Sequence, residues 1–331
     1  MDFPEASLAT TAAPGHPSVS VVVPVYNGAA TLPELLERVQ ATLAPVTTAF
    51  EVIFVNDGSR DDSWAVIEAL AAREPAVIGL DLMHNYGQHN ALLAGILRSS
   101  HDVVVTMDDD LQHPPEELPK LLAAIGEGYD VAYGKPARRE HSSWRNVSSR
   151  LAKGALRVAL GADMAEKSSA FRAFRAELKK GFAGFTDARV SVDVLLSWSA
   201  RSVAGVTVAH HARKQGRSGY SMRKLLSLTL SMMVGYSTLP LRLASGLGVV
   251  AAAFGLVIFM VVVIQRLIQE ASVPGFAFIA AAVSLFAGLQ LFTLGVIGEY
   301  LARVHFRTMG KPAFVVRSET SMNKFTRGTN P

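Results

Sequence analysis

The sequence predicts a doubly wound α/β domain followed by two membrane-spanning helices. Between residues 18 and 126, apolar runs rich in valine and isoleucine alternate with amphipathic segments, a pattern typical of parallel strands joined by helices. Polar clusters follow three of the expected strands, and two long uncharged stretches lie near the C-terminus. The chain has 331 residues, 50% of them hydrophobic, which is enough for one ordinary domain and a more apolar region.

The first expected strand, at 18–25, is a continuous apolar run of the kind found in buried parallel strands. The helix expected at 31–43 has Thr31 at its N-cap and Glu34 at its third position, which predicts a capping box. The same alternation then continues, with strands expected at 50–55, 77–82 and 102–107 and helices at 61–73, 90–99 and 115–126. Residues 1–17 are expected to form a flexible lead-in without the basic and apolar regions of a signal peptide.

Two stretches near the C-terminus, 243–265 and 271–298, contain no charged residue. Each exceeds the roughly 20 apolar residues that cross a bilayer. A pair of buried core helices is the alternative, which two such stretches in tandem disfavour. Both flanks are rich in Arg and Lys, so the positive-inside rule places them in the cytoplasm. The preceding segment, 225–242, is apolar but contains Ser and Thr, and it is expected to be an interfacial helix.

A cluster of carboxylates at 108–110 directly follows the strand expected at 102–107. Neighbouring carboxylates repel one another unless a cation lies among them, and oxygen ligands suit Mg²⁺ or Mn²⁺, which usually also hold substrate phosphates. An acidic turn that caps the next helix is the alternative interpretation. Polar residues also follow two other strands, at 26–27 and 56–59. Because parallel strands end at a common edge where ligands bind, the sequence favours a metal–diphosphate site.

Several other classes of site are excluded or disfavoured. The chain contains no cysteine, which excludes disulfides, thiolate catalysis and zinc–thiolate sites. It lacks the glycine patterns of a dinucleotide fold and of a P-loop, so phosphate must be held by metal and side chains. The formal net charge is +4, and the basic residues gather near the apolar stretches, which favours an anionic membrane surface over nucleic acid. The basic, glycine-containing segment 213–221 is suited to closing over a diphosphate, although a membrane-surface linker is the alternative.

An ordered series of motifs carries a resemblance that extends from about residue 18 to about 316. The motifs are PVYN at 24–27, NDGSRD at 56–61, NYGQHNALLAG at 85–95, DDDLQHPPEE at 108–117, FRAFR at 171–175, RKQGRSGYS at 213–221, LPLRLAS at 239–245 and GEYLARV at 298–304. With them the chain resembles the family-2 glycosyltransferases of GT-A fold. Within that family it resembles the polyprenyl-phosphate glycosyltransferases, which include dolichyl-phosphate mannose synthase and the bacterial undecaprenyl-phosphate aminoarabinose and glucosyl transferases.

The resemblance implies a Rossmann-like GT-A domain at 18–224, the interfacial helix at 225–242, two transmembrane helices within 243–298 and a cytoplasmic tail at 299–331. It implies inverting, metal-dependent transfer of a sugar from a nucleoside diphosphate sugar, expected to be a UDP-sugar, to a polyprenyl phosphate. The product would serve cell-envelope glycan or lipid modification. The expected location is the bacterial inner membrane, with a cytoplasmic catalytic domain and a homo-oligomeric, tetrameric assembly.

The resemblance also assigns residues by their place in the motifs. The nucleotide is expected to contact Pro24, Tyr26, Asn27, Asp57, Asp108 and Asp109. Metal binding falls to Asp110, Asp108 and Gln112, which together with Arg213 are the expected catalytic residues. Acceptor phosphate is expected at Lys135, Arg138, Arg145 and Arg150, and the loop over the diphosphate at Arg213, Arg217, Ser218 and Tyr220. A phosphate acceptor is already anionic and needs little help from a base, although Asp109 could still act as one.

The chain departs from the family pattern at three positions. Gly28 stands where the family usually has Glu, His84 where it usually has Arg, and Asn56 where it usually has Asp. These departures concern nucleotide contacts and leave the D-x-D pair intact. A processive polysaccharide synthase is the main alternative, but neither Trp144 nor Trp198 lies in its Q-x-x-R-W motif. A non-catalytic nucleotide-binding scaffold is the second alternative, which the intact D-x-D pair disfavours.

Overall fold

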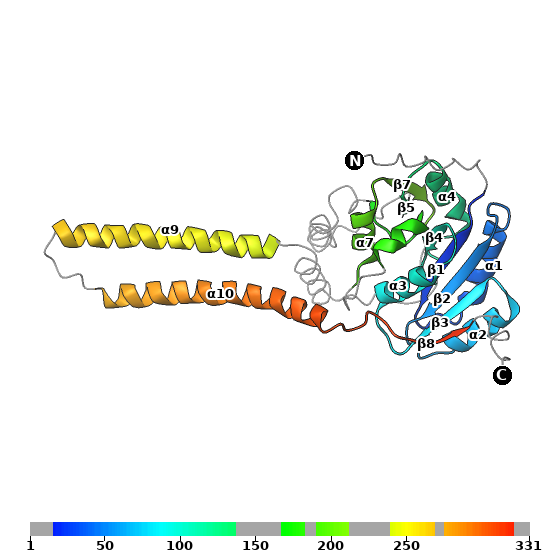
Figure 1. Ribbon diagram of the computed structural model, residues 1–331, viewed down its shortest axis with the longest axis horizontal. Helices are drawn as coiled ribbons and strands as arrows, with labels where there is room; N and C mark the ends of the chain where they lie inside the picture. Colours follow the sequence, from blue (N-terminus) through cyan, green and yellow to red (C-terminus); the bar gives the residue numbers. More distant parts are fainter. Residues whose placement is uncertain (1–15, 137–166, 183–189, 212–238, 269–274, 321–331) are drawn as a thin grey trace, which may run out of the picture. The chain divides into compact units, whose positions relative to one another are not determined.

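The computed structural model describes residues 16–136, 167–182, 190–211, 239–268 and 275–320 (Figure 1). The chain divides into two compact units, one α/β and one formed by the long C-terminal helices. The strands are β1 (Val19–Val25), β2 (Phe50–Asn56), β3 (Val77–Leu82), β4 (Val103–Thr106), β5 (Val131–Pro136), β6 (Arg172–Arg175), β7 (Val203–Val208) and β8 (Val316–Thr320). The α-helices are α1 (Leu32–Leu43), α2 (Ser63–Arg73), α3 (Gln88–Arg98), α4 (Leu118–Gly126), α7 (Val192–Ser199), α9 (Leu239–Ile268) and α10 (Phe276–Thr308). Short 3₁₀ turns occupy Pro115–Glu117 and Ala176–Gly181.

The sheet of the α/β unit has eight strands in the order β7-β5-β6-β4-β1-β2-β3-β8 (Figure 1). The four predicted strands β3, β2, β1 and β4 are adjacent and parallel, which confirms the α/β prediction for this part of the fold. The sheet as a whole is mixed, because β6 runs antiparallel between β4 and β5 and β8 runs antiparallel beside β3. Neither antiparallel strand was predicted, since both are short and contain charged residues in place of an apolar run.

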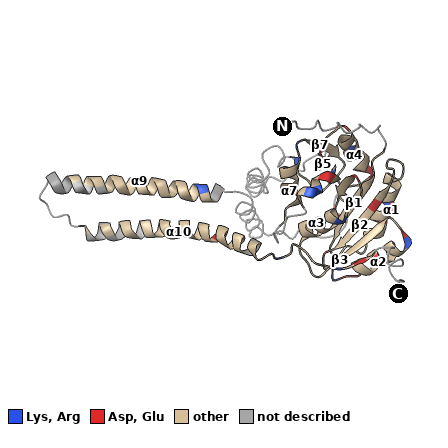
Figure 2. Cartoon of the chain, in the orientation of Figure 1, with Lys and Arg blue, Asp and Glu red and all other residues tan. Residues whose placement is uncertain are grey.

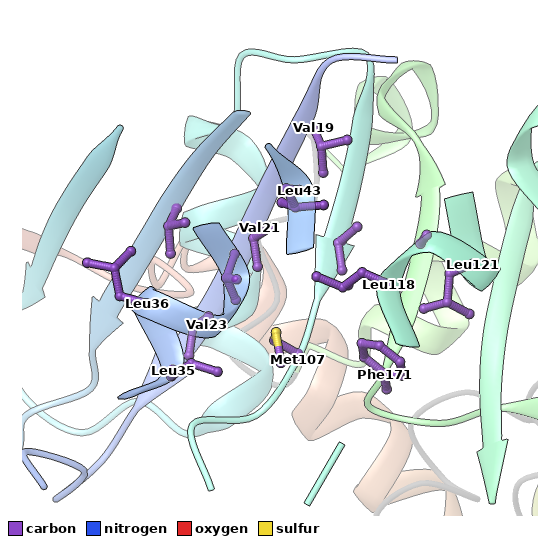
Figure 3. Packing of buried hydrophobic residues seen from close by; sticks show 14 of the residues in the cluster. Val19, Val21, Val23, Leu35, Leu36, Leu43, Met107, Leu118, Leu121 and Phe171 are labelled. Carbon is purple, nitrogen blue, oxygen red and sulfur yellow. The ribbon is translucent and has the colours of Figure 1, made fainter. Parts of the chain in front are cut away.

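The core forms on both faces of β1, whose side chains are fully buried. On one face, Val19, Val21 and Val23 pack with apolar side chains that come largely from α1 and α4 (Figure 3). On the opposite face, α3 approaches β1 closely at Gly95. A Cβ atom at Gly95 would lie 2.3 Å from Val22 Cγ1, so the helix can sit at this distance only with glycine there. Helices on both faces hold the parallel strands in place and fix where their carboxyl ends lie.

The N-terminus of α1 differs from the capping box that was predicted. Thr31 is the N-cap residue, but its side chain makes no cap hydrogen bond to the helix. The Thr31 hydroxyl instead donates to the backbone oxygen of Gly28 at 3.0 Å. The Thr31 N–H donates to the same oxygen, also at 3.0 Å, so this residue closes the turn that follows β1.

The second unit contains α9 and α10, which lie side by side and carry few charged residues among those described (Figures 1 and 2). Within the described chain, one helical window has the length and apolarity to cross a membrane. It is Leu241–Ile258 in α9, with a mean hydropathy of 2.0. The apolar stretch of α10 is shorter, Phe286–Ala302, so the second predicted span at 271–298 is not confirmed.

The boundaries at the C-terminus also differ from the predicted ones. Residues 239–242 of the expected interfacial helix belong to α9, and 225–238 lie outside the described residues. Residues 299–331 were expected to be a cytoplasmic tail, yet α10 continues to Thr308 and β8 joins the sheet of the α/β unit. The antiparallel pairing of β8 with β3 is the physical reason that this segment belongs to the sheet, and no local sequence pattern indicates that pairing.

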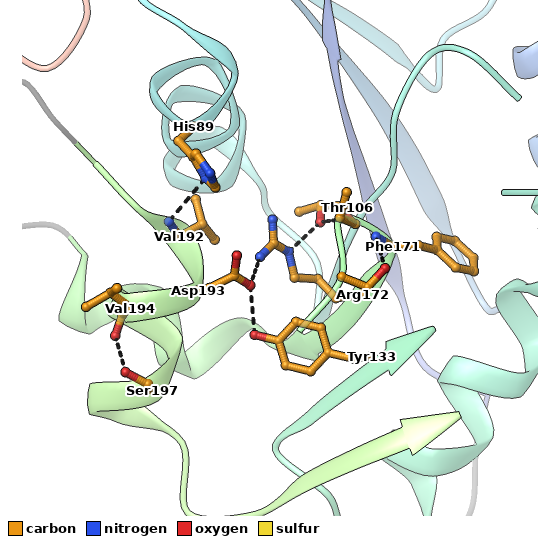
Figure 4. Close-up of polar contacts among 11 residues, drawn as sticks. His89, Thr106, Tyr133, Phe171, Arg172, Val192, Asp193, Val194 and Ser197 are labelled. Carbon is orange, nitrogen blue, oxygen red and sulfur yellow. Dashed lines mark hydrogen bonds and ion pairs between the residues drawn. The ribbon is translucent and has the colours of Figure 1, made fainter. Parts of the chain in front are cut away.

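A buried arginine connects the strand β4 to its neighbours (Figure 4). Arg172 of β6 is only 1% exposed, and it forms an ion pair with Asp193 of α7. Its Nε donates to the Thr106 hydroxyl at 2.9 Å, and the Tyr133 hydroxyl donates to Asp193 at 3.0 Å. Burial would lower the pKa of Arg172, but the neighbouring Asp193 and Tyr133 raise it, so the guanidinium stays charged. The network therefore fixes the end of β4, from which the acidic loop starts.

Replacing Arg172 by Met should strongly destabilise the α/β unit, because Asp193 would lose its partner in a largely buried place. Removing one partner of a buried pair costs about 3–5 kcal/mol, which would lower the thermal unfolding midpoint by roughly 6–20 °C. The measurement is thermal unfolding of the purified full-length protein. Tyr133→Phe is the matched control, since it removes one hydrogen bond and should cost about 1 kcal/mol. Equal losses in the two variants would contradict this account.

Candidate functional site

The site forms where the loops that follow β1, β2 and β4 meet the N-terminus of α3. Two adjacent residues at the start of α3 connect carboxylates that are far apart in the sequence. The Gly87 N–H donates to Asp57 at 2.9 Å, and the Gln88 amide donates to Asp108 at 2.6 Å. The loop after β2 and the acidic loop after β4 are therefore held beside the same helix end, where the helix dipole also favours negative charge.

Asp57 organises the segment that precedes α3. It is 3% exposed, and it accepts the backbone N–H of Tyr86 at 2.6 Å as well as that of Gly87. Burial raises the pKa of Asp57, although these two donors act in the opposite direction. The carboxylate thus orders the 84–87 segment through two backbone hydrogen bonds.

The loop after β2 packs directly against this segment. Gly58 has a φ of +66°, and a Cβ there would lie 2.6 Å from the backbone nitrogen of Asn85, so both conformation and space require glycine. Beside the contact, the rings of His84 and Tyr86 stack with centroids 3.7 Å apart at an interplanar angle of 21°. The stacked pair offers a flat surface next to Asp57, which is suited to a nucleotide base.

The loop after β1 is tied to the loop after β2 by hydrogen bonds. Asn27, whose φ of +56° is tolerated by asparagine, donates its N–H to the Ser59 hydroxyl at 3.0 Å and accepts the Arg60 N–H at 2.8 Å. Pro24 lies in β1 opposite Val55 of β2. The side chain of Tyr26 is 48% exposed at the edge of the site.

The acidic loop packs against Gly28, the position that departs from the family pattern. A Cβ at Gly28 would lie 2.2 Å from an Asp109 carboxylate oxygen, so Asp109 occupies the space that a side chain at 28 would need. Asp109 also accepts the backbone N–H of Tyr26. Burial, followed by repulsion from Asp108 and Asp110, raises the pKa of Asp109 to about 7. Asp109 therefore joins the loops after β1 and β4.

The turn after the three aspartates is strained. Leu111 has a φ of +57°, which is uncommon for leucine, and its side chain is buried in the core. Asp110 accepts the Gln112 backbone N–H at 3.1 Å, and the Gln112 backbone oxygen accepts the His211 N–H at 2.8 Å. Packing of Leu111 and these bonds hold the carboxylate of Asp110 and the residue Gln112 on the same short turn.

The donor set of this turn fits a divalent cation. Asp108, Asp110 and Gln112 offer oxygen atoms only, as Mg²⁺ and Mn²⁺ prefer. Burial is the main cause of the raised pKa of Asp109, and the repulsion from Asp108 and Asp110 that adds to it is what a cation would relieve. Among the residues that the structure describes, no three His, Cys, Asp or Glu side chains are grouped to hold a metal by themselves. A cation held here would therefore need further oxygen ligands, which substrate phosphates supply.

Of the remaining predicted residues, Lys135 is the one that lies within the described part of the chain. Lys135 lies in β5 opposite Thr207 of β7, and its Cε atom lies close to Gly205, where an added Cβ would be 3.3 Å away. The other predicted phosphate and loop residues lie outside the described residues: Arg138, Arg145, Arg150, Arg213, Arg217, Ser218 and Tyr220.

Sequence reasoning gave no individual role to Gln88, Gly87 or His113. Gln88 lies within the NYGQHN motif, but its bond to Asp108 becomes evident only in the fold. Gly87 acts through its backbone, which leaves no side-chain signature. His113 stacks on Phe171 at a centroid distance of 5.1 Å, and burial together with nearby His210 lowers the pKa of His113 to about 4. That histidine therefore remains neutral beside the acidic turn.

Comparison with known proteins gives a consistent family. The family model described as "Glycosyl transferase family 2" matches residues 20–182. The undecaprenyl-phosphate 4-deoxy-4-formamido-L-arabinose transferase of Pseudomonas aeruginosa (strain LESB58) is 38% identical over 301 residues, which cover 90% of this chain and 89% of that protein. The transferase of the same name from Shewanella sediminis is 35% identical and covers 90% of this chain and 91% of its own length. Among solved structures, glucosyl-3-phosphoglycerate synthase from Mycobacterium tuberculosis is 21% identical with a TM-score of 0.49, covering 66% of this chain and 76% of that one.

Gly28→Ala should destabilise the protein, because the new methyl group would displace the Asp109 carboxylate. Overpacking of this kind costs about 1–3 kcal/mol. In an Asp109→Ala background the same change should cost clearly less, and a double-mutant cycle of unfolding midpoints measures the difference. Gly126→Ala is the control, since an added Cβ there meets nothing within 4 Å. Equal costs with and without Asp109 would show that the two residues do not compete for space.

Proposed function

We propose that this chain, which belongs to glycosyl transferase family 2, transfers a sugar from a UDP-sugar to undecaprenyl phosphate or a similar polyprenyl phosphate. The chain is a glycosyltransferase by that membership. The proposed acceptor is the one for which the relatives are named, and those relatives match nine tenths of the chain, so the similarity is not confined to the α/β unit. A sugar related to 4-deoxy-4-formamido-L-arabinose is the first donor to test.

The observation that carries the proposal is the joining of Asp57 and Asp108 at the start of α3. In this proposal the stacked His84 and Tyr86 receive the base beside Asp57, and the acidic turn, held to the start of α3 by Gln88, receives the diphosphate. A nucleoside diphosphate has these two ends, an aromatic base and a charged diphosphate. Pro24, Tyr26 and Asn27 border the same edge of the sheet, where we assign them to the nucleotide.

The acidic turn is the proposed metal site, with Asp110, Asp108 and Gln112 as its protein ligands. A bound Mg²⁺ or Mn²⁺ supplies charge neutralisation for the leaving diphosphate. In this proposal Asp110 is the principal ligand, while Asp108, which accepts the Gln88 amide, acts at the ribose and the metal. Arg213, with Arg217, Ser218 and Tyr220, covers the diphosphate in this proposal.

The acceptor phosphate requires alignment more than deprotonation. A phosphate monoester has its second pKa near 6, so it is already anionic at neutral pH and attacks without a strong base. Lys135, Arg138, Arg145 and Arg150 hold it in line with the anomeric carbon, which inverts in a single displacement. Asp109 packs against Gly28 and accepts the Tyr26 N–H, which favours a structural role over that of a base.

The apolar helices explain how a water-soluble donor meets a lipid acceptor. We assign α9 and α10 as a pair of membrane spans of the bacterial inner membrane, with the α/β unit on the cytoplasmic side. The window Leu241–Ile258 supports the first span, and the basic residues on both flanks support the orientation. A homo-oligomer, tetrameric by resemblance, completes the proposal.

Membranes that contain the protein should move radiolabel from a UDP-sugar into a chloroform-soluble, mild-acid-labile lipid. Asp110→Ala should lower this transfer by at least about a hundredfold, as expected when transition-state charge loses its support. Glu127→Gln, which changes an exposed carboxylate at the end of α4, is the control and should retain activity. Screening several UDP-sugars against undecaprenyl and decaprenyl phosphate would identify the substrates. A water-soluble or polymeric product would contradict the proposal and favour a processive synthase.

Chelation of divalent cations should abolish transfer, because the acidic turn would lose its counter-charge. Activity measured after EDTA treatment should return when Mn²⁺ or Mg²⁺ is added in excess, and it should not return in Asp110→Ala. Full activity in EDTA would rule out the proposed metal site.

A further inference from the structure

The strand β8 forms the edge of the sheet on the nucleotide side of the site. It pairs with β3 antiparallel, so that Asp81 lies opposite Ser318 and Leu82 opposite Val316, with an irregularity between the two pairs. Further bonds extend the contact in both directions. The Gly79 N–H donates to the Thr320 hydroxyl at 2.8 Å, and the Met83 N–H donates to the Val315 oxygen at 3.0 Å. The strand thus reaches the point where β3 passes into the 84–87 segment.

Arg317 makes two contacts from this strand. Its Nη1 lies 3.4 Å from the Asp81 carboxylate, and its Nη2 donates to the Met83 backbone oxygen at 2.8 Å. The Asp81 side chain is 5% exposed and that of Arg317 is 56% exposed, so a partly solvated guanidinium neutralises a buried carboxylate. Met83 directly precedes His84, whose ring stacks on that of Tyr86.

Asp81 passes this contact on to the loop after β2. Its other carboxylate oxygen accepts the Asn56 side-chain N–H at 2.8 Å. The Asn56 side-chain oxygen accepts the Ser59 N–H at 3.3 Å, which closes the Asn56–Ser59 loop around Asp57 and Gly58. The Asn56 amide can donate to Asp81 and accept from Ser59 at once, whereas an ionised carboxylate can only accept. An aspartate at 56, which the family usually has, would instead place like charges together.

We propose that Arg317 is a positioning residue for nucleotide binding. It supports the Asn56–Ser59 loop through Asp81 and Asn56, and the 84–87 segment through the backbone oxygen of Met83. The inference rests on the proposed function, because it takes the Asp57 loop and the His84–Tyr86 pair as the nucleotide side of the site. Losing Arg317 should weaken binding of donor and transition state alike, which raises KM and leaves kcat nearly unchanged.

A second ion pair on the same strand separates this role from simple attachment of β8. Glu319 pairs with Arg98 at the end of α3 at 2.7 Å, and both side chains are about one third exposed. Glu319 attaches β8 to α3 through this ion pair. Among the described residues, its side chain makes no hydrogen bond or ion pair with the Asn56–Ser59 loop or the 84–87 segment. If β8 needs only to be attached, loss of Glu319 and loss of Arg317 should have the same effect.

The experiment is calorimetric titration of the full-length, detergent-solubilised protein with UDP in the presence of Mn²⁺, accompanied by donor KM and kcat. Arg317→Gln should weaken UDP binding about fivefold to tenfold, the change expected when the site loses the net contribution of one ordinary hydrogen bond. Arg317→Lys should recover part of the affinity, because an ammonium group can still face Asp81. Glu319→Gln should remain within about twofold of the wild type in UDP affinity, the difference expected from a solvent-exposed ion pair.

Each result bears on a separate claim. If wild-type protein binds UDP and Arg317→Gln binds equally well, the positioning role is wrong and the proposed function stands. If Glu319→Gln loses as much affinity as Arg317→Gln, β8 acts only as an attachment and the inference is overturned. If the wild type neither binds UDP nor transfers sugar, the proposed function fails and the inference fails with it. Arg317→Lys provides the comparison if Arg317→Gln does not fold.

Discussion

Carboxylates gathered at the carboxyl edge of a buried sheet need partners, and the loops of this protein are arranged around that requirement. Asp57 takes backbone N–H donors from Tyr86 and Gly87, and Asp108 takes the amide of Gln88. Asp109 takes the N–H of Tyr26. Each bond connects loops from different strands. Satisfying buried charge therefore also assembles the site, since an unpaired carboxylate in such a place is costly.

Contacts between neighbouring strands support this edge, in addition to the contacts between its loops. Arg172, with Asp193 and Thr106, holds the end of β4 from the neighbouring antiparallel strand. Asp110 then lies on a strained turn next to Leu111, and the Leu111 side chain is fixed in the core. Rigid placement of this kind suits a reaction in which alignment and charge neutralisation outweigh acid–base chemistry. The acceptor that we propose, a phosphate, needs little else.

The outer wall of the site depends on a strand from the far end of the chain. β8 follows α10 in sequence, yet it pairs with β3, and Arg317 reaches the Asp81 carboxylate there. Asn56 fits this arrangement, because it donates to Asp81 where an aspartate would repel it. Asn56, which departs from the family pattern, therefore has a hydrogen-bond acceptor in Asp81. At Gly28, another departure, the Asp109 carboxylate occupies the space that a side chain would need.

The sequence by itself determined the four central parallel strands, most helix boundaries to within a few residues, and the polar loops that follow β1, β2 and β4. These features depend on local apolar runs and turn residues, which a sequence displays directly. The tertiary structure alone decided the antiparallel strands β6 and β8, the hydrogen bond of Thr31 to Gly28 and the partners of Asp81. Those features depend on contacts between distant residues, in which short or charged segments gain their place from a neighbouring strand and from buried groups that need a partner.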